Sequence, residues 1–170
     1  IYTSTGEVYG NNCSPFNEEM IPDPVSPYSS TKLMAEELIR TFCKTSNINY
    51  TIFRLFNFYG GDMPEHFFIS QMVNTLLRKE NFKMTAGEQV RDFIHINDLT
   101  DALMKSVCRN ELYNDIFNLC SGKNITIKEI ANMIVKIVGT DAEIDAENLP
   151  YRENEIMEML GNPDKLRSKM

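Results

Sequence analysis

Residues 26–55 read SPYSSTKLMAEELIRTFCKTSNINYTIFRL and contain the signals of a helix followed by a strand. Ser26 carries a hydroxyl of the kind that caps helix N-termini, and Pro27 suits the first helical position. The helix is expected to continue to about Ser46. Residues 49–55 combine β-branched and aromatic side chains, which indicates a buried strand. The segment therefore predicts one step of a chain in which helices and strands alternate.

The alternation continues on both sides of this segment. A strand end is expected at residues 1–4 and a loop at residues 5–23. After a loop entry at 56–61, the pattern predicts helices at 67–78, from Asn97 or Asp98 to about 108, from Thr126 to Gly139, and from Pro163 onward. It predicts short strands at 82–85, 91–96, 115–119 and 143–144. Alternating strands and helices predict an α/β architecture with parallel pairing.

The composition is that of an ordinary globular chain. Its 170 residues suit one domain with a substantial core. The formal net charge of −7 argues against a nucleic-acid or anionic-membrane surface, because phosphate contacts need a basic face. No apolar run approaches the length of a membrane span. The four cysteines are widely spaced without a CxxC pair, which indicates reduced thiols in the core, no metal site and a cytoplasmic protein.

Two patterns are interpreted as structural. His95 alternates within an expected strand, which favours a structural role over catalysis. Ile130, Ile134 and Ile137 have helical spacing, and we expect all three to lie in the core.

The pair Tyr28 and Lys32 is the strongest chemical signal of the chain. Four residues apart on the expected helix, the two side chains emerge from one face. A neighbouring ammonium group favours the phenolate over the phenol, which suits a tyrosine that transfers protons. Chance alone supplies roughly 0.4 such pairs in a chain of this composition, so the spacing needs the support of its context.

That context is a series of five motifs. In chain order they are TSTGEVYG at 3–10, PYSSTKLMAE at 27–36, RLFNFYG at 54–60, RDFIHIND at 91–98, and Arg152 with Glu155. Together they resemble the extended short-chain dehydrogenase/reductase family, and more narrowly its NAD-dependent epimerase/dehydratase group, which acts on nucleotide sugars. The resemblance covers nearly the whole chain.

The resemblance implies an α/β fold in two parts. Residues 1–60 would form the C-terminal part of a Rossmann-type doubly wound sheet. Residues 61–170 would form mostly a small α/β substrate-binding domain, with some return to the first sheet. No strand–GxGxxG–helix unit is present, so we expect the N-terminal cofactor-binding half to be missing. The resemblance also implies a homodimer for the full-length protein.

The resemblance assigns four catalytic residues. Tyr28 would be the acid or base, and Lys32 would also bind the nicotinamide ribose of NAD or NADP. Thr5 would hold the substrate oxygen. Glu7 is either a proton donor or a loop carboxylate. Gly6 replaces an Asp that dehydratases of the family carry, so 4,6-dehydration loses support.

The remaining site residues would bind ligands. Phe56 would contact the nicotinamide, although plain core packing is an equal alternative. Asn57 would contact the substrate, because an amide offers both a donor and an acceptor. Arg91 and Arg152 would bind the diphosphate through their guanidinium groups. Glu155 would hold ribose hydroxyls or pair with Arg152.

The implied reaction is NAD(P)-dependent hydride transfer at C4 of a nucleotide-diphosphate sugar. A 4-epimerase is favoured, and a 4-ketoreductase is the alternative within the same class. A non-catalytic cofactor-binding module, or an inactive fragment, is the alternative from another class.

Overall fold

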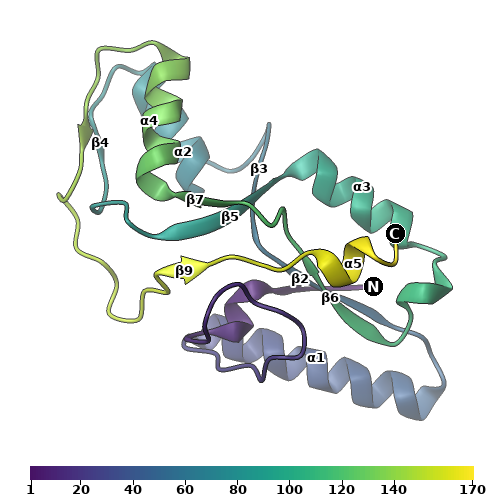
Figure 1. Ribbon diagram of the computed structural model, residues 1–170. Coiled ribbons are helices and arrows are strands. Elements are labelled where there is room, and N and C mark those ends of the chain that lie inside the picture. Colours follow the sequence, from purple (N-terminus) through teal and green to yellow (C-terminus); the bar gives the residue numbers. More distant parts are fainter.

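The computed structural model describes residues 1–170, and its first unit is a three-stranded parallel sheet. The strands β1 (Tyr2–Thr5), β2 (Thr51–Leu55) and β6 (Asp115–Leu119) lie in the order β1-β2-β6. Helix α1 (Pro27–Ser46) covers one face of the sheet, and α3 (Ile96–Ser106) and α5 (Asp164–Arg167) cover the other (Figure 1). The α/β architecture with parallel pairing is therefore confirmed.

Alternation along β2 determines what each face of this sheet contains. Phe53 points toward α3 and α5, where it forms a buried apolar cluster with Leu99, Phe117 and Leu166. Arg54 points to the opposite face, toward α1, since successive side chains of a strand alternate. One face is thus an ordinary apolar core, whereas the other contains buried charge.

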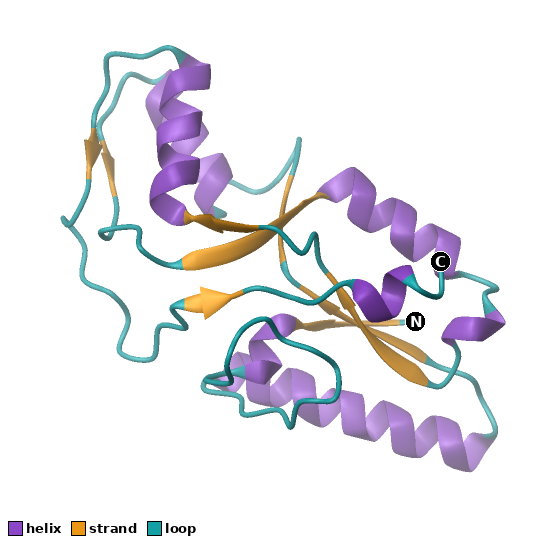
Figure 2. Ribbon diagram, viewed as in Figure 1, coloured by secondary structure: helices purple, strands orange, loops and turns teal.

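A second sheet is built around β5 (Val90–His95). Two strands run parallel to β5 and pair with it, β3 (Asn57–Tyr59) and β9 (Glu158–Met159). A third, β7 (Asn124–Thr126), pairs with β5 in the antiparallel direction. Helices α2 (Phe68–Leu77) and α4 (Ile127–Val138) pack together through a buried cluster. This pair lies at the upper left of Figure 2, far from α1. A two-stranded ladder of β4 (Phe82–Lys83) and β8 (Ile144–Asp145) lies beside them.

The local signals for helices were the most accurate predictions. Helix α1 spans Pro27–Ser46, with Ser26 as its cap. Helix α4 is capped by Thr126 and ends at Gly139, which has a left-handed φ of 66°. Strand β6 has the predicted bounds. None of the helices combines the length and the apolar character needed to cross a lipid bilayer.

Several predicted details are wrong. Residues 6–9, expected in a loop, form a short 3₁₀ helix, η1 (Gly6–Tyr9), and the expected loop after β2 contains β3. A second 3₁₀ helix, η2 (Asn110–Leu112), and the strands β7 and β9 were not predicted. The cap of helix α3 is His95, two or three residues before the predicted Asn97 or Asp98, and its Nδ1 accepts the backbone N–H of Asn97 at 3.2 Å. That contact agrees with a structural role for His95.

Two expectations about burial are also partly wrong. Ile130 and Ile134 are buried, but Ile137 is 79% exposed. The buried face of α4 contains Ala131 beside these two isoleucines, and Ile137 lies outside that face. Cys43 and Cys120 are core residues as expected, whereas the other two cysteines are exposed.

The cap of α4 gives a first testable prediction. Thr126 Oγ1 accepts the backbone N–H of Glu129 at 3.1 Å, and the Glu129 carboxylate accepts the backbone N–H of Thr126 at 2.8 Å. Thr126→Ala removes the capping oxygen and is expected to lower the free energy of unfolding by about 1 kcal/mol. Denaturant unfolding measures this loss. Thr126→Ser keeps the oxygen and should stay close to the wild type, and an equal loss in both variants would contradict the prediction.

Candidate active site

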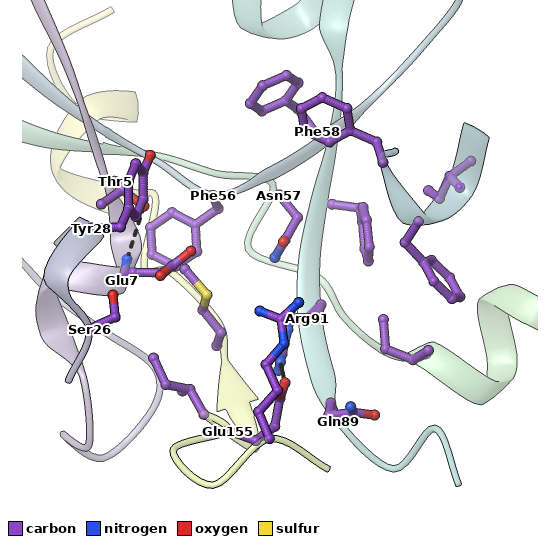
Figure 3. A pocket seen from close by; sticks show the side chains of 18 of the residues that line it. Thr5, Glu7, Ser26, Tyr28, Phe56, Asn57, Phe58, Gln89, Arg91 and Glu155 are labelled. Carbon is purple, nitrogen blue, oxygen red and sulfur yellow. Dashed lines mark hydrogen bonds and ion pairs between the residues drawn. The ribbon is translucent and has the colours of Figure 1, made fainter. Parts of the chain in front are cut away.

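A cavity of about 1060 Å³ lies between the two sheets. Its wall is formed by the ends of β1 and β2, the start of α1, strand β5 and the segment 149–156. Figure 3 shows part of this wall from close by. The structure brings together in this one cavity all nine residues that the sequence motifs single out, namely Thr5, Glu7, Tyr28, Lys32, Phe56, Asn57, Arg91, Arg152 and Glu155.

The parallel pairing of β1 and β2 explains why residues far apart in sequence meet here. Thr5 and Leu55 are register partners, so both strands reach the same edge of the sheet before the chain turns away. In open α/β sheets, ligands bind outside the carboxyl ends of the strands. Thr5 ends β1, Glu7 follows shortly after it, and Phe56 and Asn57 follow directly after β2, so these four residues line the cavity.

The first turns of α1 bring Tyr28 and Lys32 to this edge. The Tyr28 side chain is 52% exposed and lies on the same side of the cavity as Thr5 in Figure 3. Lys32 Nζ donates to the carbonyl oxygen of Thr3 at 2.9 Å and lies 5.1 Å from the centroid of the Tyr2 ring. Lys32 is thus held against β1, one helical turn from Tyr28.

Thr5 and Glu7 are joined by a local contact. Thr5 Oγ1 accepts the backbone N–H of Glu7 at 3.2 Å and so caps η1, while the hydroxyl still lines the cavity. Burial raises the pKa of the Glu7 carboxyl above its usual range, and the opposing attraction of Arg152 and Arg91 is too weak to cancel this rise. Glu7 is therefore a carboxylate whose charged form is poorly stabilised.

This raised pKa predicts a pH-dependent effect of Glu7→Gln. Since the folded pKa lies above the unfolded one, the folded state is penalised at pH values above the folded pKa and not at pH values below both. Glu7→Gln should therefore increase stability at about pH 7 and leave it nearly unchanged at about pH 3.5. Thermal unfolding at both pH values measures the difference. Glu111→Gln, at an exposed position, is the matched control, and an equal gain at both pH values would contradict the prediction.

Gly6 is in close contact with the floor of the site. A Cβ atom at this position would lie 3.0 Å from the ring of Phe56 and 3.1 Å from the terminal methyl of Met159. Both distances are shorter than ordinary van der Waals contact, so a larger side chain needs its neighbours to move.

Phe56 is a core residue that also lines the cavity. Its ring is 3% exposed and packs in a core cluster with Phe16, Cys120 and Met159. One side of the residue nevertheless lines the cavity. Phe56 gives the site an apolar floor that is anchored in the core.

Asn57 carries an unpartnered donor. Its Nδ2 atom is buried and makes no hydrogen bond. Figure 3 shows the amide end directed into the cavity, toward Arg91. A buried amide without a partner costs about 1–3 kcal/mol, so a ligand that supplies an acceptor would relieve this cost.

Arg91 and Glu155 form the main ion pair of the cavity. Arg91 also donates to the carbonyl oxygens of Val90, at 2.9 Å, and Met157, at 3.4 Å. Burial lowers the pKa of Arg91 below its usual range, although the neighbouring Glu155 opposes the change. Glu155 thus pairs with Arg91 and not, as one alternative had it, with Arg152. The Arg152 side chain is exposed and makes no ion pair.

Other residues of the cavity were not assigned from the sequence. Gln89 is buried and exchanges hydrogen bonds with Thr85. An aromatic group lines the opposite end of the cavity, consisting of Phe58, Tyr59, Phe67, Phe68 and Phe93. These residues come from three separate segments, and no local spacing signals that they meet.

Residues 1–120 match the family model described as the NAD-dependent epimerase/dehydratase family. The chain belongs to this family. The three-stranded parallel sheet with helices on both faces agrees with the Rossmann-type fold of this family.

Two curated epimerase/dehydratase relatives illustrate the similarity. UDP-arabinose 4-epimerase 1 of Arabidopsis thaliana is 31% identical, over 100% of this chain and 46% of its own length. GDP-6-deoxy-D-talose 4-dehydrogenase of Aggregatibacter actinomycetemcomitans is 28% identical, over 96% of this chain and 55% of its own length. The chain therefore spans about half the length of the curated relatives it matches.

A solved structure agrees with this family assignment. UDP-glucuronic acid 4-epimerase from Bacillus cereus, in complex with UDP-glucuronic acid and NAD, superimposes with a TM-score of 0.91 at 25% identity. The similarity covers 98% of this chain and 53% of the other chain. As with the curated relatives, this chain therefore corresponds to about half of the solved structure.

Proposed function

We propose that the full-length protein is an NAD(P)-dependent nucleotide-sugar 4-epimerase. The observation that carries the proposal is the set of residues that line the cavity between the two sheets. An acid/base tyrosine, a lysine and a threonine hydroxyl line the same space as two arginines and the unpartnered amide of Asn57. The first three residues suit proton transfer from a hydroxyl, and the last three suit an anionic, hydroxyl-rich ligand.

The arginines support a diphosphate as the anionic part of that ligand. Guanidinium groups bind phosphate oxygens through two parallel hydrogen bonds, and two of them suffice for a dianion despite a net charge of −7. The Asn57 amide lies beside Phe56 and points toward Arg91 in Figure 3, so its free N–H would suit an oxygen between diphosphate and sugar. Family membership and the substrates named for the relatives support the same class of ligand.

The residues at the edge of β1 and β2 fit the nicotinamide end of a dinucleotide. Tyr28 and Lys32 offer a hydroxyl and an ammonium for a ribose, and Phe56 offers an apolar surface for a ring. When bound, NAD or NADP would accept the hydride from C4 and return it. The chain contains no glycine-rich turn between a strand and a helix, so these residues hold only one end of the dinucleotide.

The remaining steps belong to the residues of this chain. Thr5 would hold the C4 oxygen by a hydrogen bond, and Tyr28 would take the hydroxyl proton as the C–H bond breaks, which leaves a 4-keto sugar. Lys32 would favour the phenolate form that accepts this proton. Tyr28 would then return the proton to the oxygen after hydride addition to the other face of C4. The result is the 4-epimer, with no net oxidation.

A 4-ketoreductase is the second candidate. It would use only the returning half of the same sequence and would consume one NADH or NADPH for each sugar. The similarity to a GDP-sugar 4-dehydrogenase favours keeping it. Dehydration at C4 and C6 is less well supported, because Gly6 leaves Glu7 without a second carboxylate beside it.

The test is turnover by the full-length protein. UDP-, GDP- and dTDP-hexoses are incubated with NAD, and the products are identified by NMR while cofactor absorbance is followed. An epimerase yields the 4-epimer without accumulating NADH, whereas a reductase consumes NADH or NADPH only with a 4-keto sugar. Absence of both turnover and nucleotide-sugar binding would reject the proposal.

Arg91 gives a quantitative prediction for binding. Arg91→Met removes charge-assisted hydrogen bonds worth about 1.5–3 kcal/mol, so KM for the nucleotide sugar should rise about 10- to 100-fold. Steady-state kinetics with a panel of concentrations measures KM. Arg78→Met is the matched control, because Arg78 forms an exposed pair with Glu80 at 3.5 Å. A KM unchanged in Arg91→Met would remove Arg91 from the diphosphate site.

A further inference from the structure

We propose that a buried polar cluster of Ser4, Tyr9, Glu36 and Arg54, here called the Glu36 clamp, positions the catalytic helix on the sheet. The clamp would fix α1 so that Tyr28 and Lys32 face Thr5. The inference rests on the proposed function, since it assigns positioning residues to that reaction. None of the clamp side chains is expected to touch substrate or cofactor.

Glu36 lies on the same face of α1 as the catalytic pair. It follows Lys32 by four residues and Tyr28 by eight, so the three side chains emerge in one row. Its side chain is completely buried, which is rare for a glutamate. The row therefore begins in the cavity with Tyr28 and ends inside the protein with Glu36.

Three hydrogen bonds hold the Glu36 carboxylate. Ser4 Oγ donates to Oε1 at 2.5 Å, Arg54 Nε donates to Oε1 at 3.1 Å, and Arg54 Nη2 donates to Oε2 at 2.7 Å. The planar, two-pronged contact of arginine with a carboxylate fixes both distance and orientation. Such a contact defines where Glu36, and with it α1, lies relative to β2.

The clamp extends across the whole first sheet. Ser4, Arg54 and Asn118 are register partners on β1, β2 and β6, so their side chains lie side by side on the face toward α1. The Arg54 guanidinium lies 4.7 Å from the centroid of the Tyr9 ring, and the Tyr9 hydroxyl donates to Asn118 Oδ1 at 2.7 Å. Ser4 directly precedes Thr5. One network thus holds the strand that carries the threonine and the helix that carries the tyrosine.

Few apolar side chains of α1 are fully buried, although Leu33 packs against the core cluster that contains Val8 and Phe16. The buried residues of α1 are Ser29, Glu36 and Cys43, which follow one another at intervals of seven. A docked helix usually buries an apolar stripe, whereas here the central buried residue is Glu36, which pairs with Arg54. Replacing a buried ion pair with apolar residues is often neutral or stabilising, so folding alone does not require this pair. What the ion pair adds is a single orientation.

The experiment compares two paired replacements in the full-length protein. Glu36→Leu with Arg54→Met exchanges the clamp for apolar side chains. Glu37→Leu with Arg40→Met removes an exposed ion pair of 2.7 Å from the same helix and is the matched control. If the clamp double variant does not fold, Ser4→Ala tests the same point with one hydrogen bond removed, and Ser4→Thr restores the hydroxyl.

We expect the clamp variants to have a lower kcat and a nearly unchanged KM for the nucleotide sugar. The folded double variant should lose at least about tenfold in kcat while KM stays within about threefold, because misplacement of Tyr28 weakens the transition state and not the diphosphate contacts. The control pair should retain wild-type kcat. Ser4→Thr should recover activity lost in Ser4→Ala. A folded double variant with kcat within about twofold of the wild type would overturn the proposal.

A second measurement separates the clamp from the proposed function. The ring signal of isotopically labelled Tyr28 and the amide exchange of the first turn of α1 report the position of the helix without any substrate. Both should change in the clamp double variant and not in the control pair. If the wild type converts no nucleotide sugar, the proposed function is rejected, and the inference about helix position is still tested by these two signals. An unchanged Tyr28 signal in the double variant rejects the clamp alone.

Discussion

Tyr28→Phe is expected to lower kcat by about 10²- to 10⁴-fold while KM stays within about threefold. The substitution removes one oxygen, which is the proposed carrier of the proton from the sugar hydroxyl. The ring remains, so the shape of the cavity wall changes little. Because the Tyr28 side chain is 52% exposed and its hydroxyl has no partner in the protein, stability should be unaffected.

The measurement is steady-state turnover of a 4-epimer pair by the full-length protein, with thermal unfolding recorded in parallel. Tyr113→Phe is the matched control, because Tyr113 lies outside the cavity and undergoes the same chemical change. Full turnover by Tyr28→Phe would reject the proposed mechanism. A loss of turnover that is matched by a loss of melting temperature would point to folding instead.

Arg54→Met is expected to reduce the free energy of unfolding by about 3–5 kcal/mol. The substitution leaves the Glu36 carboxylate fully buried with only Ser4 as a donor. A charge that has lost its partner cannot recover its hydration at this site, and the penalty falls on the folded state alone. The apolar replacement of both partners avoids this penalty, so Glu36→Leu added to Arg54→Met should recover much of the loss.

Urea unfolding at neutral pH measures both variants. Arg40→Met is the control, because it breaks an exposed pair on the same helix, and such pairs contribute about 0–1 kcal/mol. A loss below about 1 kcal/mol for Arg54→Met would mean that water reaches Glu36 in solution, contrary to its burial in the structure.

The sequence predicted best what depends on neighbouring residues. Helix α1 was predicted with its observed bounds because two adjacent residues, the cap Ser26 and the first helical residue Pro27, mark its start. Strand β3 was missed because it has three residues and exists only through pairing with β5, at Asn57 and Phe93. Strand β9 likewise depends on a partner more than sixty residues away. No local pattern encodes such pairings.

The candidate site shows the same division. The motifs named nine residues that the structure places around one cavity, since the ends of parallel strands meet at one edge. The partners within the site were less predictable. Glu155 pairs with Arg91 across a separation of 64 residues, and Glu36 with Arg54 across 18. Both arginines stand in quoted motifs, but the motifs do not state which carboxylate each one meets.

The close neighbours of Gly6 set a steric condition on any substitution at this position. A second carboxylate beside Glu7 would be the simplest addition for a dehydratase, and a single codon change can supply an aspartate. The Cβ of that aspartate would meet the Phe56 ring and the Met159 methyl, both of which are buried in the same core cluster. An aspartate at position 6 therefore requires the Phe56 ring and the Met159 methyl, both in the core cluster, to shift by a few tenths of an ångström.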